Sequence, residues 1–557
     1  MPTPRTMPEA LEEAARTSAG FTFVSGRAES FVSYAELRCR AVQVAGSLRD
    51  AGLRRGDLVA IVLADAEEFL ATLFGASMAG VIPASLYPPA TTSDLPRYLE
   101  LTSAILRSSG ARAVITTDAL VPEFERVRAR CPELALVLAH ASLRAACADP
   151  IDLPKIDDIA FVQYTSGSTS SPKGVALSHA NVSANVHAFT GPACVGASNA
   201  DVAVSWLPLN HDMGLVGMVF GALYSGCACV LLPPHAFVKR PSEWLSAITR
   251  HRGTLSFAPN FAYDLCVRRV KDRDMVGLDL SSWRVAGCGA EPIHPPTLAA
   301  FAQKFAPVGF RKTSYLPSYG LAEHVLAASF AACGRAPRTE EVSADALTER
   351  RIAIPHKGEG LSVALVSCGK ALPDHQIRIA GEDGRPLPER HVGEILLAGP
   401  SVMLGYYKRD ALTAQTVRDG WLHTGDLGYL SDGELFVCGR AKDVIIVHGR
   451  KYHPQDLEWA VNGLAGVRRG RVVAFGATNH GRPDRVVIVA EPNGTVVPDT
   501  LTDAIRRRIG DLFGLYVDAV ALVPSGTVGR TTSGKVQRAA TKARYERGEL
   551  VADGVKA

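Results

Sequence analysis

The chain has 557 residues, of which 47% are hydrophobic and 21% charged, and its formal charge is +4. A chain of this length exceeds what one compact core organises, so two or more domains are expected. The composition is that of an ordinary globular protein, and the dispersed Lys and Arg residues exclude the concentrated basic surface of a nucleic-acid-binding protein.

No targeting or membrane-spanning segment is predicted. Residues 1–20 lack the apolar region of a signal peptide, and the eleven cysteines show no metal-like spacing, so we expect a cytoplasmic protein with reduced thiols. Gly214–Leu232 is uncharged and long enough to span a membrane. Its four glycines favour instead a buried helix over Gly214–Tyr224, a glycine turn, and a buried strand over Ala228–Leu232.

The N-terminal part of the chain alternates helical and strand patterns from about Ser33 to Leu138, and similar units recur from Ile159 to about Phe330. This alternation predicts parallel sheets covered by helices. The predicted helices of the first stretch are Tyr34–Leu48 and Glu68–Met78, and its predicted strands are Leu58–Leu63 and Ala113–Thr116.

The second half of the chain changes character twice. Arg335–Leu361 is polar without strong periodicity, which indicates an inserted surface segment. From Val366 to Phe436, short strands separated by glycine turns dominate. Beyond Gly439–Asp443, a module of roughly 110 residues mixes strands and helices. The predicted strands of the Val366–Phe436 stretch include Val392–Ala398 and Gly433–Val437. The predicted strands of the module are Val444–Val447, Arg471–Phe475 and Arg485–Ala490, and its predicted helices are Pro454–Gly463 and Leu501–Phe513.

These patterns predict an α/β protein of two domains. A large N-terminal domain, residues 1–439, would hold helix-covered, mostly parallel sheets, a β-rich subdomain, and an insertion at 335–361. A small, mobile α+β C-terminal domain, residues 440–557, would follow.

A polar loop, Tyr164–Gly174, follows the predicted strand Ile159–Val162. Its two glycines allow close backbone approach, and its six hydroxyl residues and one lysine suit a triphosphate. It is not a Walker A loop, because Pro172 stands where the second glycine is needed. Taken alone, a solvated Ser/Gly linker is the alternative. The candidate phosphate ligands are Thr165, Ser166, Gly167, Ser168, Thr169 and Lys173.

Five further motifs follow the loop in order: Gly289-Ala-Glu-Pro292, Ser318-Tyr-Gly-Leu-Ala-Glu323, Trp421-Leu-His-Thr-Gly-Asp-Leu-Gly428, Gly439-Arg-Ala-Lys-Asp443 and Thr531-Thr-Ser-Gly-Lys535. Together with the loop they resemble the signature motifs of the adenylate-forming superfamily, which includes acyl-CoA synthetases, adenylation domains and luciferases. The resemblance extends over about two thirds of the chain.

The resemblance implies that the chain uses ATP and Mg²⁺ and assigns a role to each motif. Tyr319 would pack on adenine, and Asp426 with Arg440 would hold the ribose. Glu323, with Thr165, would hold magnesium, Lys442 would be the hinge pivot, and Lys535 would be the catalytic lysine. Further nucleotide contacts are implied at Gly289, Ala290, Glu291, Pro292, Ser318, Gly320, Leu321 and Ala322.

The residue types fit these roles. A carboxylate such as Asp426 accepts two hydrogen bonds from ribose hydroxyls, and Glu323 offers the hard oxygen that Mg²⁺ prefers. A lysine at 535, placed between the attacking carboxylate and the α-phosphate, would offset negative charge in the transition state. Taken singly, these residues are also compatible with a turn aspartate, a helix-start charge and a surface lysine.

Within the superfamily, Ser205–Leu215, Pro259–Cys266 and Ser318–Glu323 resemble fatty acyl-AMP ligases. Two residues depart from the general superfamily pattern: Ala322 replaces a threonine, as is typical of these ligases, and Gly529 replaces the proline that usually begins the lysine motif. In this branch, of long-chain fatty acid adenylyltransferase type, a fatty acid becomes an acyl-adenylate and then passes to the phosphopantetheine thiol of a separate acyl carrier protein of a polyketide or nonribosomal peptide system.

The branch also implies roles at the acid-binding end. The insertion at 335–361 would restrict the swing of the small domain, and His211 would gate the acid pocket. Asp212, Met213, Gly214, Asn260 and Phe261 are candidate lining residues of that pocket.

Three alternatives remain open from the sequence. The first is an acyl-CoA synthetase. The second is an amino-acid adenylation enzyme, because an aspartate such as Asp212 pairs with a substrate ammonium in such enzymes. The third is a non-catalytic scaffold, against which the presence of Lys535, Asp426 and Glu323 counts.

Overall fold

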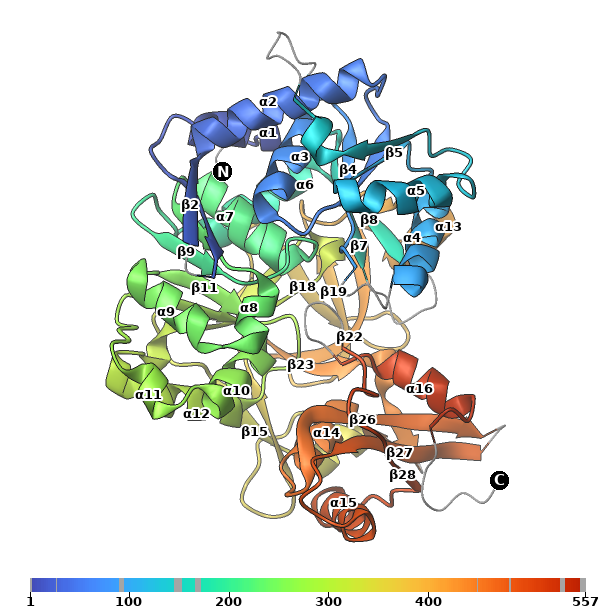
Figure 1. The fold of residues 1–557 in the computed structure, drawn as a ribbon. Helices are drawn as coiled ribbons and strands as arrows, with labels where there is room; N and C mark the ends of the chain where they lie inside the picture. The colour runs from blue at the N-terminus through green and yellow to red at the C-terminus, as the bar shows by residue number, and fades with distance from the viewer. Residues whose placement is uncertain are drawn as a thin grey trace.

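The computed structural model describes residues 3–26, 28–89, 95–144, 153–165, 172–447, 449–479, 482–530 and 536–550. Side chains are not described at 165, 478, 479 and 482–484. Figure 1 shows a large body of sheets and helices, with the orange and red C-terminal elements gathered at one end. This arrangement confirms the predicted α/β class.

A nine-stranded sheet forms one half of the large body, in the order β17-β14-β13-β12-β11-β9-β10-β1-β2. The strands from β13 to β1 run parallel, and the strands at both edges run antiparallel. Parallel sheets of this kind need helices on their faces. The strands are β1 (Gly20–Ser25), β2 (Ala28–Ser33), β9 (Val202–Ser205), β10 (Ala228–Leu231), β11 (Leu255–Ala258), β12 (Val285–Cys288), β13 (Tyr315–Gly320), β14 (Ala327–Phe330) and β17 (Lys370–Ala371).

A seven-stranded sheet forms the other half, in the order β20-β8-β7-β4-β3-β5-β6. Its five strands from β7 to β6 are parallel, so the predicted parallel sheets are confirmed. The strands are β3 (Leu58–Val62), β4 (Ile82–Ser85), β5 (Ala113–Thr116), β6 (Leu136–Ala139), β7 (Ile159–Thr165), β8 (Lys173–Ser178) and β20 (Gly405–Tyr406).

Helices cover these sheets, and polar side chains cap the starts of some of them. The Ser33 hydroxyl accepts a hydrogen bond from the Glu36 N–H at the start of α2, and Asp65 caps α3 in the same way. The helices of the large body are α1 (Met7–Ala14), α2 (Tyr34–Asp50), α3 (Ala66–Met78), α4 (Leu95–Ser109), α5 (Val121–Arg128), α6 (His179–Thr190), α7 (Gly221–Ser225), α8 (Pro234–Lys239), α9 (Ser242–Arg250), α10 (Asn260–Arg269), α11 (Asp272–Met275), α12 (Pro295–Phe305) and α13 (Asp410–Thr416).

The uncharged stretch Gly214–Leu232 folds as a buried helix, a glycine turn and a strand, as predicted. Its helix begins as a π-helix, Met213–Phe220, and continues as α7. Gly226 ends the helix with φ of 65°, a left-handed conformation that favours glycine, and β10 follows. Among the residues that the structure describes, no helix combines the length and apolar character needed to cross a membrane.

A five-stranded sheet follows the large sheets and forms the predicted β-rich part. Its order is β18-β19-β22-β21, with β23 also paired to β22. The strands are β18 (Gln376–Ala380), β19 (Gly393–Ala398), β21 (Val417–Arg418), β22 (Trp421–Ser431) and β23 (Glu434–Arg440).

The predicted surface insertion at 335–361 contains secondary structure that its weak periodicity did not indicate. Its strand β15 (Thr339–Ser343) pairs antiparallel with β16 (Ser362–Val366), which follows the insertion directly, and a π-helical turn within it spans Ala346–Arg350. Glu340 contributes to the polar pattern, yet its carboxylate lies 2.6 Å from Arg338 and 3.1 Å from Arg390 and is largely buried. A charged residue that pairs inside the protein therefore looked like a surface residue in the sequence.

The C-terminal elements have cores of their own. Two clusters of buried apolar residues lie entirely within residues 445–550. The domain boundary at 439/440 stays a prediction. The elements are β24 (Ile445–Val447), β25 (Arg450–Tyr452), β26 (Val467–Asn479), β27 (Arg482–Pro492), β28 (Ala519–Leu522), α14 (Pro454–Asn462), α15 (Pro498–Phe513) and α16 (Arg538–Glu546).

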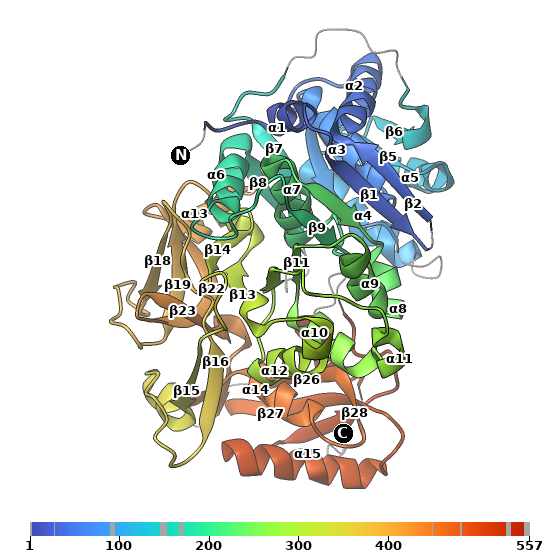
Figure 2. The same cartoon turned by 90° about the vertical axis from the view of Figure 1, so that its left-hand side faces the viewer.

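The insertion lies against these C-terminal elements. Figure 2 shows β15 and β16 beside them, and Glu349 of the π-helical turn forms an ion pair of 2.6 Å with Arg450 of β25. Leu347 of the insertion and Leu457 of α14 line a small shared cavity. The insertion therefore makes a charged contact with the C-terminal part and shares the lining of a cavity with it.

Candidate active site

A cleft of about 1740 Å³ lies between the large body and the C-terminal elements. Most of the described candidate residues line it, although they come from distant parts of the chain. These residues are Lys173, His211, Asp212, Met213, Asn260, Phe261, Ala290, Glu291, Pro292, Ser318, Tyr319, Gly320, Leu321, Ala322, Glu323, Asp426, Arg440 and Lys442. Gly289 and Gly214 do not line the cleft.

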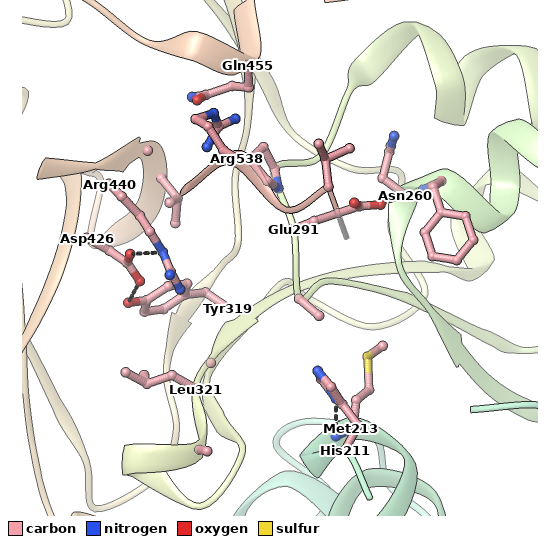
Figure 3. A pocket seen from close by; sticks show the side chains of 18 of the residues that line it. His211, Met213, Asn260, Glu291, Tyr319, Leu321, Asp426, Arg440, Gln455 and Arg538 are labelled. Atoms are coloured by element: carbon pink, nitrogen blue, oxygen red, sulfur yellow. Dashed lines mark hydrogen bonds and ion pairs between the residues drawn. The ribbon is translucent and has the colours of Figure 1, made fainter. Parts of the chain in front are cut away.

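One side of the cleft carries a hydrogen-bonded group of three residues (Figure 3). The Tyr319 hydroxyl donates to Asp426 Oδ2 at 2.8 Å, and Arg440 Nε lies 3.1 Å from Asp426 Oδ1. Asp426 and Arg440 are cross-strand neighbours on β22 and β23, so the sheet fixes their pairing. Each carboxylate oxygen can accept a further hydrogen bond, so Asp426 can still receive donors from a ligand.

Burial and charge shift the titration of this group. The pKa of Tyr319 is raised by burial and by the Asp426 charge. The pKa of Arg440 is raised chiefly by Asp426. Tyr319 is therefore a neutral donor and Arg440 a permanent cation.

Glu323 lies in a short turn just after β13, and a tyrosine that the sequence did not indicate holds its side chain. The Tyr406 hydroxyl donates to Glu323 Oε1 at 2.9 Å, and Lys173 Nζ lies 4.9 Å from the centre of the Tyr406 ring. Lys173, Tyr406 and Glu323 thus form a chain of contacts from β8 across β20. No signal in the sequence marks Tyr406, because its partner lies 83 residues away.

The predicted phosphate loop joins two antiparallel strands. Tyr164 pairs with Gly174 and Thr165 with Lys173 in the register of β7 and β8. The strand β8 between the loop and helix α6 was not predicted. Ser166, Gly167, Ser168 and Thr169 lie outside the described residues, as does the Thr165 side chain.

The segment Gly289–Pro292 requires close backbone approach. A Cβ on Gly289 would lie 2.7 Å from Ser318 Oγ and 2.9 Å from the Ser318 carbonyl oxygen, so glycine lets the two motifs pack together. Glu291 Oε1 accepts a hydrogen bond of 2.5 Å from the Phe261 N–H at the start of α10. These contacts connect the adenine-side motif with the candidate acid pocket.

The predicted hinge residue Lys442 lies in a short 3₁₀ turn, Ala441–Asp443, and faces the cleft. Its pKa is lowered by burial and by the neighbouring Arg440 charge. Gln455 of α14 donates to the Cys438 carbonyl just before the hinge, so the C-terminal part contacts β23 directly. Sequence reasoning did not identify Gln455.

The opposite side of the cleft carries His211 and Met213 (Figure 3), and Asp212 between them also lines the cleft. His211 Nδ1 lies 2.6 Å from Asp212 Oδ1, and the Met213 N–H donates to the same oxygen at 2.7 Å. Gln163 Nε2 donates to the Asn210 carbonyl at 2.6 Å and so fixes the turn before His211 to β7. The Asp212 carboxylate is therefore engaged by its own neighbours.

Lys535 lies outside the described residues. The two residues that flank its segment, Arg530 and Val536, both line the cleft. Arg530 and Val536 form an isolated β-bridge, and the Gln537 N–H donates to the Gly529 carbonyl at 3.0 Å. Glu491, which is completely buried, accepts hydrogen bonds from the Gly526 and Val528 N–H groups. The two ends of the lysine segment are thus held together.

Arg538, three residues after Lys535, fixes the far end of this segment to the hinge. It lies 2.8 Å from Asp443 and 2.9 Å from Glu458 of α14, and Glu458 also accepts the Ala474 N–H. Sequence reasoning did not identify Arg538.

We expect Arg538→Met to loosen the C-terminal elements, because it leaves Glu458 buried without its counter-ion. Breaking such a buried pair costs about 3–5 kcal/mol. Hydrogen exchange in α14 should accelerate by a hundredfold or more, roughly the factor that 3 kcal/mol gives. The control is Lys542→Met on the same helix α16, whose 3.8 Å pair with Glu546 is solvent-exposed, so exchange should stay near wild type. Equal exchange in both variants would contradict this account.

Comparisons with known proteins identify the family of the chain. The family of AMP-binding enzymes matches residues 11–407. A Caulobacter vibrioides (strain NA1000 / CB15N) protein provisionally named acyl-CoA synthetase is 37% identical, covering 97% of this chain and 95% of that protein. The medium-chain-fatty-acid–[acyl-carrier-protein] ligase JamA of Moorena producens (strain JHB) is 34% identical, covering 97% of this chain and 94% of JamA. A solved structure from work on fatty acyl-adenylate ligases from E. coli and L. pneumophila is 37% identical, with a TM-score of 0.92 and coverage of 98% of both chains.

Proposed function

The chain belongs to the family of AMP-binding enzymes and is a fatty acyl-AMP ligase, and we propose that it passes the acyl group to the phosphopantetheine thiol of a separate acyl carrier protein. Pyrophosphate leaves in the first step, when the acid carboxylate attacks the α-phosphate of ATP. The carrier would belong to a polyketide or nonribosomal peptide system.

The observation that carries the proposal is one cleft with two chemically different sides. Tyr319, Asp426 and Arg440 offer ribose and adenine contacts on one side, and His211 and Met213 lie on the other. A nucleotide and a carboxylic acid bound on these sides would meet between them. Attack at phosphorus needs this positioning more than a covalent protein group.

The chain's own residues fit a magnesium ion that is shared with the nucleotide. Mg²⁺ usually binds one or two carboxylates together with waters and substrate phosphates. Glu323 offers one such carboxylate in the cleft, and Tyr406 fixes one of its oxygens. When bound there, Mg²⁺ would neutralise phosphate charge.

The remaining roles fall to side chains at the two ends of the cleft. Asp426 would accept hydrogen bonds from ribose hydroxyls while Arg440 and Tyr319 hold its carboxylate in place. Lys173 would bring positive charge toward the phosphates, and Lys535 would offset charge at the attacked phosphate. His211 would orient the acid carboxyl group.

Transfer to a carrier requires that the site opens to a thiol. Rotation of residues 440–557 about Lys442 would provide this access. The contacts of the insertion with the C-terminal part, including Glu349–Arg450, support a restricting role for residues 335–361. A restricted rotation would favour a carrier-bound thiol over free coenzyme A.

The test is product analysis with ATP, Mg²⁺ and saturated fatty acids of graded length. Each acid is incubated alone, with coenzyme A, with a purified holo acyl carrier protein, or with the same carrier in its apo form. We expect acyl-AMP in every reaction and little acyl-CoA. The carrier protein should become acylated only when it is added in its holo form.

One observation favours a second candidate, an acyl-CoA synthetase: the provisional name of the Caulobacter relative. Rapid acyl-CoA formation in the same assay would support that candidate and reject the carrier step. Pyrophosphate exchange that depends on an amino acid, and not on a fatty acid, would reject the fatty acid as the substrate.

A further inference from the structure

The backbone turns in an unusual way directly after Glu323. Val325 has φ of 63° and ψ of −62°, and the Leu326 N–H donates to the His324 carbonyl at 2.7 Å across it. These values define a γ-turn of the rare, strained form with a positive φ, which is a genuine outlier for a β-branched residue. Strain of this kind persists only where the surrounding structure holds it, and it clusters at active sites and ligand clamps.

Asn185 of α6 holds this turn from both sides. Helix α6 lies beside β14, the strand that follows the turn (Figure 2). The completely buried Asn185 side chain donates through Nδ2 to the His324 carbonyl at 3.3 Å and to the Ala327 carbonyl at 2.8 Å. Its Oδ1 accepts the Ala327 N–H at 3.1 Å. Because two partners are acceptors and the third is a donor, this set of bonds needs an amide in one orientation.

Tight packing closes the turn as well. Val325 is completely buried. A Cβ on Gly320 would overlap the Leu326 carbonyl oxygen, so glycine lets β13 pass close to the turn. His324 Nδ1 lies 2.8 Å from the Ala327 carbonyl oxygen, which can only accept, so the ring donates there. The positive φ is therefore imposed by contacts from outside the turn.

Glu323 is held between this turn and a second segment. The Tyr406 hydroxyl donates to Glu323 Oε1 at 2.9 Å, and the Met403 N–H donates to the Glu323 carbonyl at 3.0 Å. On its other side, the chain enters the γ-turn within two residues. Relaxation of Val325 to a negative φ would change the path of the backbone beside Glu323 and move the carboxylate relative to Tyr406.

We propose that Asn185 is a positioning residue: by holding the strained turn at Val325, it keeps the Glu323 carboxylate in place for the Mg²⁺ that accompanies ATP. The proposal rests on the proposed function, in which Glu323 offers a carboxylate to magnesium. Asn185 does not line the cleft, so it acts through the backbone and not on the nucleotide.

The test is the affinity of Asn185→Ala for ATP, measured by calorimetry without acid, once with Mg²⁺ and once with EDTA. Alanine removes all three hydrogen bonds of the side chain and lets the turn relax. We expect the affinity with Mg²⁺ to fall roughly tenfold to a hundredfold, as when a residue that supports a metal ligand is replaced. The affinity with EDTA should stay near that of the wild type, because Tyr319, Asp426 and Arg440 keep their contacts.

Ser183→Ala is the matched control. Ser183 is completely buried on the same helix, its hydroxyl accepts the Arg5 N–H at 3.0 Å, and neither residue lines the cleft. The gain in ATP affinity that Mg²⁺ gives should equal that of the wild type.

Asn185→Asp is the second variant, and it covers the case in which Asn185→Ala does not fold. It keeps the size of the side chain and an acceptor for the Ala327 N–H, but its ionised carboxylate has no hydrogen for the two carbonyls. The same selective loss of affinity with Mg²⁺ is expected.

The role of strain is tested by Val325→Gly, because glycine adopts a positive φ without the steric penalty of a side chain. In this background, Asn185→Ala should weaken binding with Mg²⁺ clearly less than it does in the wild type, since no strain remains to be held. An equal loss in both backgrounds would contradict the strained-turn account.

Two further results would overturn the assignment. One is wild-type affinity with Mg²⁺ in a folded Asn185→Ala or Asn185→Asp variant. The other is a loss that is equal with Mg²⁺ and with EDTA, or that Ser183→Ala shares, because either would reveal a general structural role. A wild-type enzyme that forms no acyl-AMP, or that binds ATP equally with Mg²⁺ and with EDTA, would instead reject the proposed function, and this assignment with it.

Discussion

Replacing Lys535 by alanine should reduce acyl-AMP formation by a factor of 10² to 10³, roughly the loss seen when one preorganised charge stabiliser is removed from an active site. The amine is assigned to charge that develops at the attacked phosphate, and so it acts in the transition state. The loss should therefore appear in kcat, measured as pyrophosphate release at saturating ATP and acid.

Two further measurements separate this role from a structural one. The affinity of Lys535→Ala for ATP, measured by calorimetry, should be nearly unchanged, because Tyr319, Asp426 and Arg440 remain. Acyl transfer from supplied acyl-adenylate to a holo carrier protein should also persist. Lys542→Ala on α16 is the control for loss of a lysine nearby in the chain, and near-normal adenylation in Lys535→Ala would refute the assignment.

Asp426→Asn should raise KM for ATP roughly tenfold to a hundredfold, since hydrogen bonds to a charged group contribute about 1.5–3 kcal/mol. The substitution removes the charge that pairs with Arg440 and turns one acceptor into a donor facing the Tyr319 hydroxyl or Arg440. KM for the fatty acid should change little, because His211 and Met213 lie on the other side of the cleft.

The control for this variant is Asp432→Asn. Asp432 lies in the turn between β22 and β23, and its side chain is 75% exposed. It should leave both KM values at the wild-type level. If Asp426→Asn bound ATP as tightly as the wild type, the ribose-binding role of Asp426 would be wrong.

The predictions from sequence worked best where local patterns decide structure. The strand Ala113–Thr116 was placed correctly at both ends, and the helix predicted at Tyr34–Leu48 extends two residues further, to Asp50. Both depend on short-range periodicity and, for α2, on the Ser33 cap. Motif order also brought Tyr319, Asp426 and Arg440 into one hypothesis before their contacts were known.

The same reasoning misjudged residues whose partners are distant in the chain. Glu340 looked like a surface charge, yet Arg338, Arg390 and Ser431 surround it. Arg538 was passed over because its partners Asp443 and Glu458 precede it by 95 and 80 residues. A charged side chain gives no local sign of whether it is solvated or paired.

By itself, the sequence determined the α/β class and the family, because periodicity and ordered motifs are properties of the chain. It also predicted a set of residues for binding ATP and an acid. The tertiary structure alone decided how these residues are used: that Tyr406 holds Glu323 and that Asp212 faces His211. A hydrogen bond depends on the distance and direction between two groups, and folding sets both.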